Sequence, residues 1–365
     1  MIKEIGSTFW VNPDLDYSER HMIPLDQFNL KGSDWLFLST ARSCIKLAAE
    51  TAISNNAIST KTVVVPSFTC YTCTLPFENL GFNIVPLPVS KDLTTSPEKL
   101  RETVLGSNAS IVLLHQYFGF ETMKSMEPVI KELREKGVVI IEDRTQCLYS
   151  NFSPLPADFY VASIRKWAGL PDGGIIVCSD GKLDKKVEKK DVEFETIKMQ
   201  ASIAKYHYIF DKQGDKEYFR SLYEKAADVL ASEKEYFLIS DSSTCVQHYL
   251  DINELKEKRI NNYRHLYMKL SGLKTIGVVF NPSDDEVPLY FPLKTNGNRE
   301  ALQKYLASKN IYAPIIWPYE INVEVNENAT YLYNDLLCIP VDQRYGIDDM
   351  DRIASEIIYF DRSKS

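Results

Sequence analysis

The stretch VVIIEDRTQC occupies residues 138–147. With the preceding Gly137, its first residues form the run Gly137–Ile141 (GVVII), a nearly continuous series of β-branched residues that is typical of a strand buried on both faces. The run ends at Glu142 and Asp143, so carboxylates stand at the carboxyl end of the predicted strand. Two runs of the same kind, TVVV at 62–65 and ASIVLL at 109–114, come earlier in the chain. We therefore expect buried parallel strands at all three places.

Helical spacing of apolar residues separates these runs. It occurs over residues 42–53, 68–80 and 123–136, and a further helix is expected to begin near 96–97. Additional strand-like segments are 35–39, 83–89, 159–163 and 174–178. Strands that alternate with helices indicate a mostly parallel sheet with helices on both faces. The sequence therefore predicts an α/β fold with three layers, α/β/α, over residues of about 35–180.

The remaining segments predict an unequal division of the chain. Residues 1–34 show no strong period, and we expect an N-terminal arm there. The charge-dense stretch 182–197 favours a solvated face or a mobile loop. Residues 217–270 read as helical, and a smaller α+β part follows, with strands at 287–293 and 311–317 and helices at 298–308 and 348–360. The predicted units are an arm (1–34), a large domain (35–240) and a small C-terminal domain with its connecting helix (241–365).

Length and charge limit the classes of function. The 365 residues suggest about two domains. With 42 Lys and Arg against 50 Asp and Glu, the formal net charge is −8, which argues against a binder of nucleic acid or of anionic membranes. The opening residues MIKEIGSTFW lack the pattern of a signal peptide, and no apolar stretch approaches the 18 residues of a membrane span. We expect a cytoplasmic protein with no nucleic-acid or membrane partner.

The cysteines leave two readings open. Cys70 and Cys73 form a C-x-x-C, the spacing of a redox pair or of half a zinc site. The seven cysteines include no second C-x-x-C, and the five histidines do not fall at zinc-ligand spacing. This favours small buried hydrophobic side chains over ligands, and no metal is expected.

Ligands of parallel α/β sheets bind beyond the carboxyl ends of the strands. Hydroxyl and small residues at 39–43 open a helix and could bind an anion such as phosphate, or they could merely cap that helix. Asp143 could hold a protonated ring nitrogen, a metal or a helix N-terminus. Lys166 stands between two strand candidates in a partly apolar turn, which suits carbonyl chemistry, although a single lysine is more often a solvated charge.

The order of these segments resembles the fold-type I enzymes that use pyridoxal 5'-phosphate (PLP). Within them it is most similar to the DegT/DnrJ/EryC1/StrS sugar aminotransferases, as a divergent branch. The resemblance rests on residues 63–89, 111–120, 138–147 and 162–177, above all on the spacing of KWAGLPDGG and on the E-D-x-x-Q run. Residues 257–270, 298–317 and 336–357 extend it to about 35–360. It implies the fold of PLP-dependent transferases such as aspartate aminotransferase.

The resemblance also implies roles for individual residues. Lys166 would form the internal aldimine, a Schiff base with PLP, and then act as acid and base. Asp143 would pair with the pyridinium nitrogen. The other implied cofactor contacts are Gln146 near the ring or its phenolic oxygen, Tyr71 stacked on the ring, and Ala41, Arg42, Ser43 and Ser163 at the phosphate.

Three residues are candidates for the substrate side. Arg344 could clamp the donor's carboxylate with its fork of donors, or form a surface or interdomain salt bridge. Trp317 could form a wall of the substrate site, or belong to the core. His115 could touch the substrate, or be a structural histidine with hydrogen-bonded nitrogens.

The activity that the resemblance implies is transamination in a ping-pong sequence. An amino acid, with glutamate as the first candidate, would donate the amino group, and a keto compound such as a nucleotide-linked keto sugar would accept it. Fold-type I enzymes normally share their sites between subunits, which predicts a homodimer. Two alternatives remain open: a PLP-dependent lyase or decarboxylase, and a catalytically silent relative of the fold.

Overall fold

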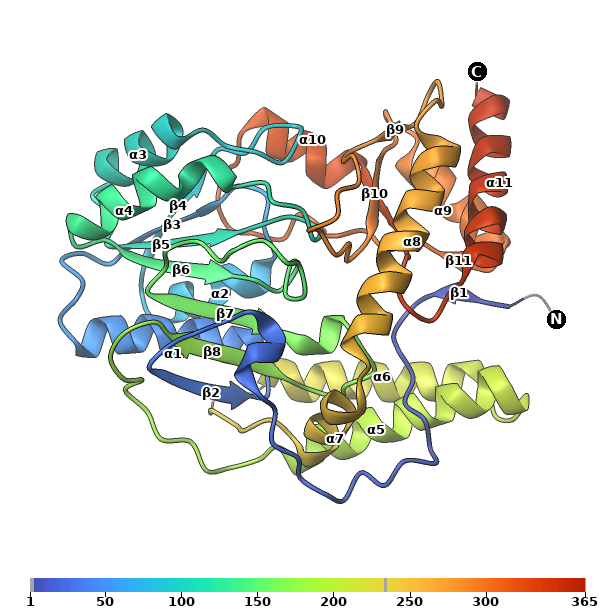
Figure 1. The fold of residues 1–365 in the computed structure, drawn as a ribbon, viewed down its shortest axis with the longest axis horizontal. Coiled ribbons are helices and arrows are strands. Elements are labelled where there is room, and N and C mark those ends of the chain that lie inside the picture. The colour runs from blue at the N-terminus through green and yellow to red at the C-terminus, as the bar shows by residue number, and fades with distance from the viewer. Residues whose placement is uncertain (1–2, 233–234, 365) are drawn as a thin grey trace.

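The computed structural model describes residues 3–232 and 235–364. Its centre is a seven-stranded sheet with the order β2-β8-β7-β6-β5-β3-β4 (Figure 1). Strands β3 to β7 are mutually parallel, whereas β8 runs antiparallel to both β7 and β2. The strands are β2 (Asp34–Leu38), β3 (Thr62–Pro66), β4 (Asn83–Leu87), β5 (Ile111–His115), β6 (Val139–Asp143), β7 (Phe159–Ser163) and β8 (Gly174–Cys178). The predicted mostly parallel sheet is confirmed.

Helices cover both faces of this sheet, as the β-branched runs require. Successive side chains of a strand point to opposite faces. Val63 and Val65 of β3 therefore pack in one apolar cluster with α1 and α2, and Val64 packs in a second cluster with α3 and α4. These helices are α1 (Ala41–Ser54), α2 (Tyr71–Asn79), α3 (Pro97–Gly106) and α4 (Glu127–Glu135), the last preceded by the 3-10 turn Lys124–Met126.

Helix α5 (Val192–Tyr206) begins inside the charge-dense stretch 182–197, for which the sequence predicted a solvated face or a mobile loop. Only the part of 182–197 before Val192 is a loop, and the rest forms the first turns of α5. The Asp191 carboxylate caps this helix by accepting a hydrogen bond from the Phe194 N–H (3.0 Å). A short π turn, His207–Asp211, leads to α6 (Lys216–Ser232), which packs against α5 through Phe194 and neighbouring apolar residues. The helical pattern predicted for 217–270 also spans residues 233–234, which lie outside the described residues.

The C-terminal part contains the second, smaller sheet, with the order β12-β10-β9 (Figure 1). Its strands are β9 (Gly277–Val278), β10 (Phe291–Lys294) and β12 (Leu336–Ile339), and its helices are α9 (Arg299–Ser308), α10 (Glu327–Asp335) and α11 (Ile347–Lys364). Helices α7 (Asp241–Tyr249) and α8 (Ile252–Leu270) connect it to the large sheet. The strand expected over 311–317 is limited to β11 (Ile311–Tyr312), and Pro314, which has no N–H, follows closely.

The N-terminal arm reaches the C-terminal part. Residues Ile5–Gly6 form β1, which pairs in parallel with β11, and the arm also contains the 3-10 turn Leu25–Phe28. Gly6 has a positive φ of 95°, and a Cβ there would lie 2.2 Å from the Tyr312 carbonyl oxygen, so this close pairing requires glycine. Among the described helices, none is long and apolar enough to cross a membrane.

Candidate active site

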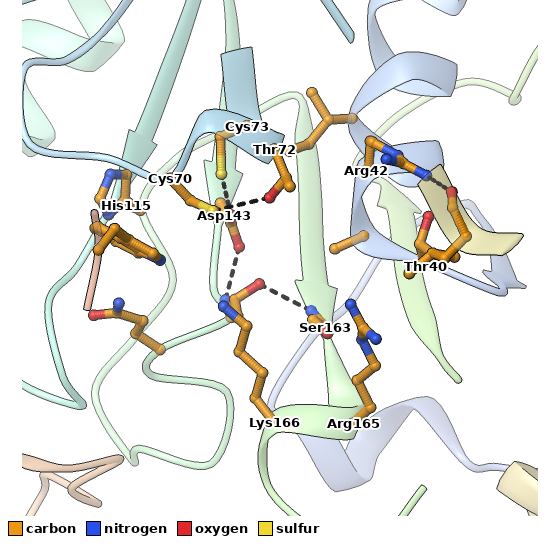
Figure 2. A pocket seen from close by; sticks show the side chains of 16 residues that line it. Thr40, Arg42, Cys70, Thr72, Cys73, His115, Asp143, Ser163, Arg165 and Lys166 are labelled. Carbon is orange, nitrogen blue, oxygen red and sulfur yellow. Dashed lines mark hydrogen bonds between the residues drawn. The ribbon is translucent and has the colours of Figure 1, made fainter. Parts of the chain in front are cut away.

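A cavity lies where β5, β6 and β7 end and where α1 and α2 begin, with about 650 Å³ of empty space, including some open to solvent (Figure 2). Parallel strands bring their carboxyl ends to one edge, so residues distant in sequence meet there. Eight of the site residues expected from the sequence line this cavity: Ala41, Arg42, His115, Asp143, Gln146, Ser163, Lys166 and Trp317. Three others, Ser43, Tyr71 and Arg344, are not among the described lining residues.

Asp143 is the last residue of β6, and it is buried with 5% of its surface exposed. Its Oδ1 atom accepts a hydrogen bond from the Thr145 N–H (2.8 Å). Its Oδ2 atom accepts one from the Cys73 thiol, with 3.6 Å between sulfur and oxygen. One donor on each carboxylate oxygen fixes the orientation of the group, and Figure 2 shows it facing the cavity. A buried, oriented carboxylate of this kind can hold a cationic ring nitrogen.

Lys166 ends the 3-10 turn Ile164–Lys166 between β7 and β8, and its side chain extends into the cavity toward Asp143 (Figure 2). The next residue, Trp167, is fully buried and fixes this turn. Its indole N–H donates to the Thr145 carbonyl (2.8 Å), and its own carbonyl accepts from the Gln343 amide (2.7 Å). The Arg259 guanidinium lies 4.7 Å from the centre of the Trp167 ring. The lysine backbone is therefore held by contacts from β6, α8 and the C-terminal part.

The Gly173-Gly174 pair allows β8 to approach the start of α1. A Cβ on Gly174 would lie 2.4 Å from the carbonyl carbon of Thr40. The Gly173 N–H donates to the Ser39 carbonyl (2.7 Å). Thr40 caps α1, because its Oγ1 accepts from the Ser43 N–H (3.1 Å), and the Ser43 hydroxyl lies 2.8 Å from the same atom. Ser43 therefore contributes to the cap. Of the two roles expected for residues 39–43, capping of the helix is the one that Thr40 performs.

One end of the cavity suits an anion. The first N–H groups of α1 have no acceptor within the helix, and the helix dipole favours negative charge there. Ser163 and Arg165 line the same end (Figure 2). The Ser163 N–H donates to Thr145 Oγ1 (2.9 Å), which places β7 against the β6 loop. The Arg42 guanidinium donates to the Leu230 carbonyl of α6 (2.6 Å), so this arginine joins α1 to α6 at the cavity wall.

The start of α2 supplies Cys70, Thr72 and Cys73 to the cavity, whereas Tyr71 lies elsewhere. Cys70 is the N-cap residue, and residues three apart in a helix share a face. Cys70 and Cys73 therefore point the same way, and Tyr71, between them, is turned aside. The ring contact expected of Tyr71 is not among the contacts of this cavity, and its walls here are sulfur and hydroxyl groups.

The cavity contains buried polar atoms without partners in the described chain. They are His115 Nε2, Gln146 Nε2 and Trp317 Nε1. Burial lowers the pKa of His115 to about 4, so the imidazole is neutral at pH 7. A buried donor or acceptor without a partner costs free energy, so such atoms in a cavity indicate a polar ligand. An aromatic ring with a phosphate, an oxygen substituent and a ring nitrogen matches this wall, and the residues therefore fit PLP.

A second cavity adjoins the first and shares Gln146, Arg165 and Lys166 with it. It encloses about 1830 Å³ of space, including some open to solvent, between the N-terminal arm, α5 and the C-terminal part. Arg344 lies in its wall. The Arg344 Nε atom donates to Asp342 Oδ1 (2.6 Å), and its terminal nitrogens donate to the Ser7 and Thr8 carbonyls (3.1 Å each). This ion pair is buried and joins two residues of the C-terminal part, so it is neither a surface nor an interdomain salt bridge, and Arg344 also holds the arm.

Several lining residues were not assigned from the sequence. Arg165 precedes Lys166 in the sequence, and Thr145 precedes Gln146. These positions, next to predicted cofactor contacts, could have identified both residues as part of the site. Lys198 of α5 lines the second cavity, but its helix was not predicted. Among the described residues, no three His, Cys, Asp or Glu side chains are placed to hold a metal ion.

The chain is similar to several solved structures that share its fold. DesV of S. venezuelae is 16% identical, with a TM-score of 0.66, and the match covers 94% of this chain and 91% of that one. The sugar aminotransferase CalS13 of Micromonospora echinospora is 14% identical (TM-score 0.63; 89% and 87% covered). Spr1654 of Streptococcus pneumoniae, in its PLP form, is 12% identical (TM-score 0.63; 90% and 87% covered). No curated protein sequence matches this chain.

These structures are too distant in sequence to show the family, but a family model shows it. It matches residues 40–358, which include the α1 cap, Asp143, Lys166 and most of the C-terminal part. The matched range agrees with the segments from which the resemblance was inferred. The chain belongs to the DegT/DnrJ/EryC1/StrS aminotransferase family.

Proposed function

We propose that this protein uses PLP to move an amino group from an amino acid, with glutamate as the donor, to a nucleotide-linked keto sugar. It would act in the cytoplasm as a homodimer. One observation carries the proposal: Lys166, Asp143 and the N-terminus of α1 surround a single cavity. A lysine amine, a buried carboxylate and an anion site are the three groups by which a protein can hold the aldehyde, the ring nitrogen and the phosphate of PLP.

Each residue has a task that its surroundings support. PLP, when bound, supplies an electron sink for bonds at the α-carbon of an amino acid. Asp143 would keep a proton on the ring nitrogen, since its own orientation is fixed by Thr145 and Cys73. Lys166 would attach the cofactor and then carry protons at Nζ. The backbone at the start of α1, with Ser163 and Arg165, would hold the phosphate.

The second cavity supports an anionic acceptor. Its described lining includes six cationic side chains (Arg165, Lys166, Lys198, Arg259, Lys304 and Arg344) and one carboxylate, that of Asp342. Asp342 pairs with Arg344, and Lys304 pairs with Glu300 outside the lining, so the lining keeps an excess of positive charge in a protein whose net charge is −8. A diphosphate group would be attracted to such a wall. Lys166 lies in both cavities, so an acceptor bound in the second would have its carbonyl near the amine.

The first test is the absorbance spectrum of the purified protein with PLP. We expect a visible band of protein-bound cofactor that disappears in Lys166→Ala and persists in Lys182→Ala, an exposed control. Glutamate should then shift the band to the amine form of the cofactor and release 2-oxoglutarate. No band at any PLP concentration would overturn the proposal. A band that glutamate and other amino acids leave unshifted, while they lose CO₂ or a β-substituent, would indicate a decarboxylase or lyase.

A further inference from the structure

The C-x-x-C pair at the start of α2 takes no chemical part in the transfer of an amino group, although the Cys73 thiol orients Asp143. Both cysteines line the first cavity, where the start of this helix meets the end of β6 (Figure 2). Cys73 is buried, and Cys70 is half-buried. Both are thiols in this structure. Two thiols in the wall of this cavity are candidates for oxidation, because a thiol is the side chain most readily oxidised there.

The backbone places the two cysteines within bridging range. The Cys73 N–H donates to the Cys70 carbonyl (2.9 Å), which closes a tight turn. Such a turn keeps the first and fourth Cα atoms within about 7 Å, and disulfides span Cα separations of about 4.4–6.8 Å. The side chains at these positions share one face of the helix start. A rotation of the side chains would therefore join the sulfurs without moving the helix.

The surroundings give the two thiols different roles. Burial, together with the nearby Asp143 charge, raises the pKa of the Cys73 thiol well above its usual value. Its S–H donates a hydrogen bond to Asp143 Oδ2. Cys70 is the more exposed of the two, and its sulfur lies 3.0 Å from the Thr72 hydroxyl. An oxidant that enters the cavity therefore meets Cys70 first, and Cys73 is the resolving thiol.

We propose that Cys70 and Cys73 form a reversible disulfide in the wall of the cofactor cavity, and that this disulfide weakens the binding of PLP. The second half of the proposal rests on the proposed function. The bridge would remove the S–H donor from Asp143, the carboxylate that would hold the cofactor's ring nitrogen. It would also draw the two sulfurs together at the surface against which the cofactor lies.

The oxidant is a low-molecular-weight disulfide, for which glutathione disulfide is the probe. The Cys70 thiolate attacks one of its sulfurs, forming a mixed disulfide and releasing one glutathione thiolate. The Cys73 sulfur then displaces the second glutathione from Cys70, and the departing glutathione thiolate takes up the proton that the Cys73 thiol loses. Two electrons pass from the protein dithiol to the oxidant, and two glutathione thiols are released with both protons.

Formation of the bridge is measured without reference to activity. The cofactor-free protein is equilibrated with mixtures of reduced and oxidised glutathione, alkylated with N-ethylmaleimide, and weighed by mass spectrometry. We expect two fewer adducts at oxidising ratios, and seven after reduction of the denatured protein. Residues 62–91 contain no internal Lys or Arg, so one tryptic peptide carries both cysteines and should lose two hydrogens. Cys70→Ser and Cys73→Ser should abolish this loss, and Cys245→Ser should not.

Coupling to the cofactor is measured separately. We expect the oxidised protein to bind PLP at least about fivefold more weakly than the reduced protein, and PLP to oppose the disulfide by the same factor, because linkage is reciprocal. Cys73→Ser cannot form the bridge, so its PLP affinity, whatever its value, should be the same with reduced and with oxidised glutathione.

Three outcomes separate the parts of the proposal. Full alkylation at every glutathione ratio overturns the disulfide. Equal PLP affinity of the two redox forms overturns the coupling. Failure of the reduced protein to bind PLP overturns the proposed function, and the mass measurement still decides whether the disulfide forms.

Discussion

At the scale of single residues, Asp143 is the group whose charge matters most. Its carboxylate is buried and held by a backbone N–H and a thiol. We expect Asp143→Asn to keep the protein folded and able to bind PLP, because an amide fits the same space. The variant should lower kcat for the reaction with glutamate by at least about 100-fold, since the loss of a preorganised charge in a water-poor site has costs of that order. Single-turnover kinetics and PLP titration measure the two effects.

The matched control for this variant is Asp180→Asn, because Asp180 is exposed on the loop after β8. Its kcat should equal that of the unchanged protein. An Asp143→Asn variant with normal kcat would contradict the role assigned to this carboxylate.

The buried His115 should make the free energy of unfolding depend on pH. Burial lowers its pKa in the folded protein to about 4 from the usual 6.5, so the unfolded chain binds the extra proton between these values. The stability that depends on the neutral imidazole is complete above about pH 6.5 and is lost as the pH falls toward 4. A shift of this size corresponds to at most about 3 kcal/mol. Urea unfolding of the cofactor-free protein at pH 7 and pH 4.5 should show a loss that is smaller in His115→Gln.

At the scale of elements, the contact between β8 and α1 is a tight constraint on the anion end of the cavity. Gly174→Ala should push the Thr40 backbone away, because the new Cβ would lie 2.4 Å from its carbonyl carbon. We expect a loss of about 1–3 kcal/mol of stability, as for other overpacked sites, together with weaker binding of PLP. Gly106→Ala at the end of α3 is the control, since no atom lies within 4 Å of its built Cβ. Equal melting temperatures of the two variants would refute this account.

The sequence was sufficient for elements whose residues are alike in pattern and burial. The β3, β5 and β6 strands each contain three or four consecutive buried apolar residues, so their place in a parallel sheet followed directly. Helix α5 was missed because charged residues dominate its first turns, although Asp191 is an ordinary capping residue. The aromatic side chain of Tyr71 is of the type that stacks on a cofactor ring, but the sequence does not show which face of α2 it lies on. Since α2 begins at Tyr71, the neighbours Cys70 and Cys73 face the cavity instead.

At the scale of the whole molecule, the N-terminal arm joins parts that are far apart in sequence. The buried Lys205 of α5 donates hydrogen bonds to Ser7 Oγ (3.2 Å) and to the Thr8 carbonyl, while Arg344 contacts the same stretch. This network could not be read from the sequence, because its members have no shared period or spacing. It forms one wall of the second cavity, so the arm is part of the acceptor side of the proposed site.

Removal of residues 1–10 tests this role. The deletion should leave Lys205 and Arg344 without their arm partners, and buried cations without partners are destabilising. We expect the melting temperature to fall by at least about 3 °C, at about 1.3 °C per kcal/mol for a chain of 365 residues. The affinity for PLP should be preserved, because none of these residues lines the first cavity. A deletion protein with an unchanged melting temperature would show that the network contributes nothing.

The pairing of β1 with β11 has a consequence for synthesis of the chain. Ile5 pairs with Ile311, so its partner is translated 306 residues later. At about 5–20 residues per second, the first strand leaves the ribosome roughly 15–60 s before β11 exists. During that interval the large sheet can fold, whereas the backbone of Ile5 and Gly6 has no β11 strand to pair with. Closure of the arm is therefore a late event in biogenesis, and a bulky tag fused before Ile5 would act on that final step and not on folding of the sheet.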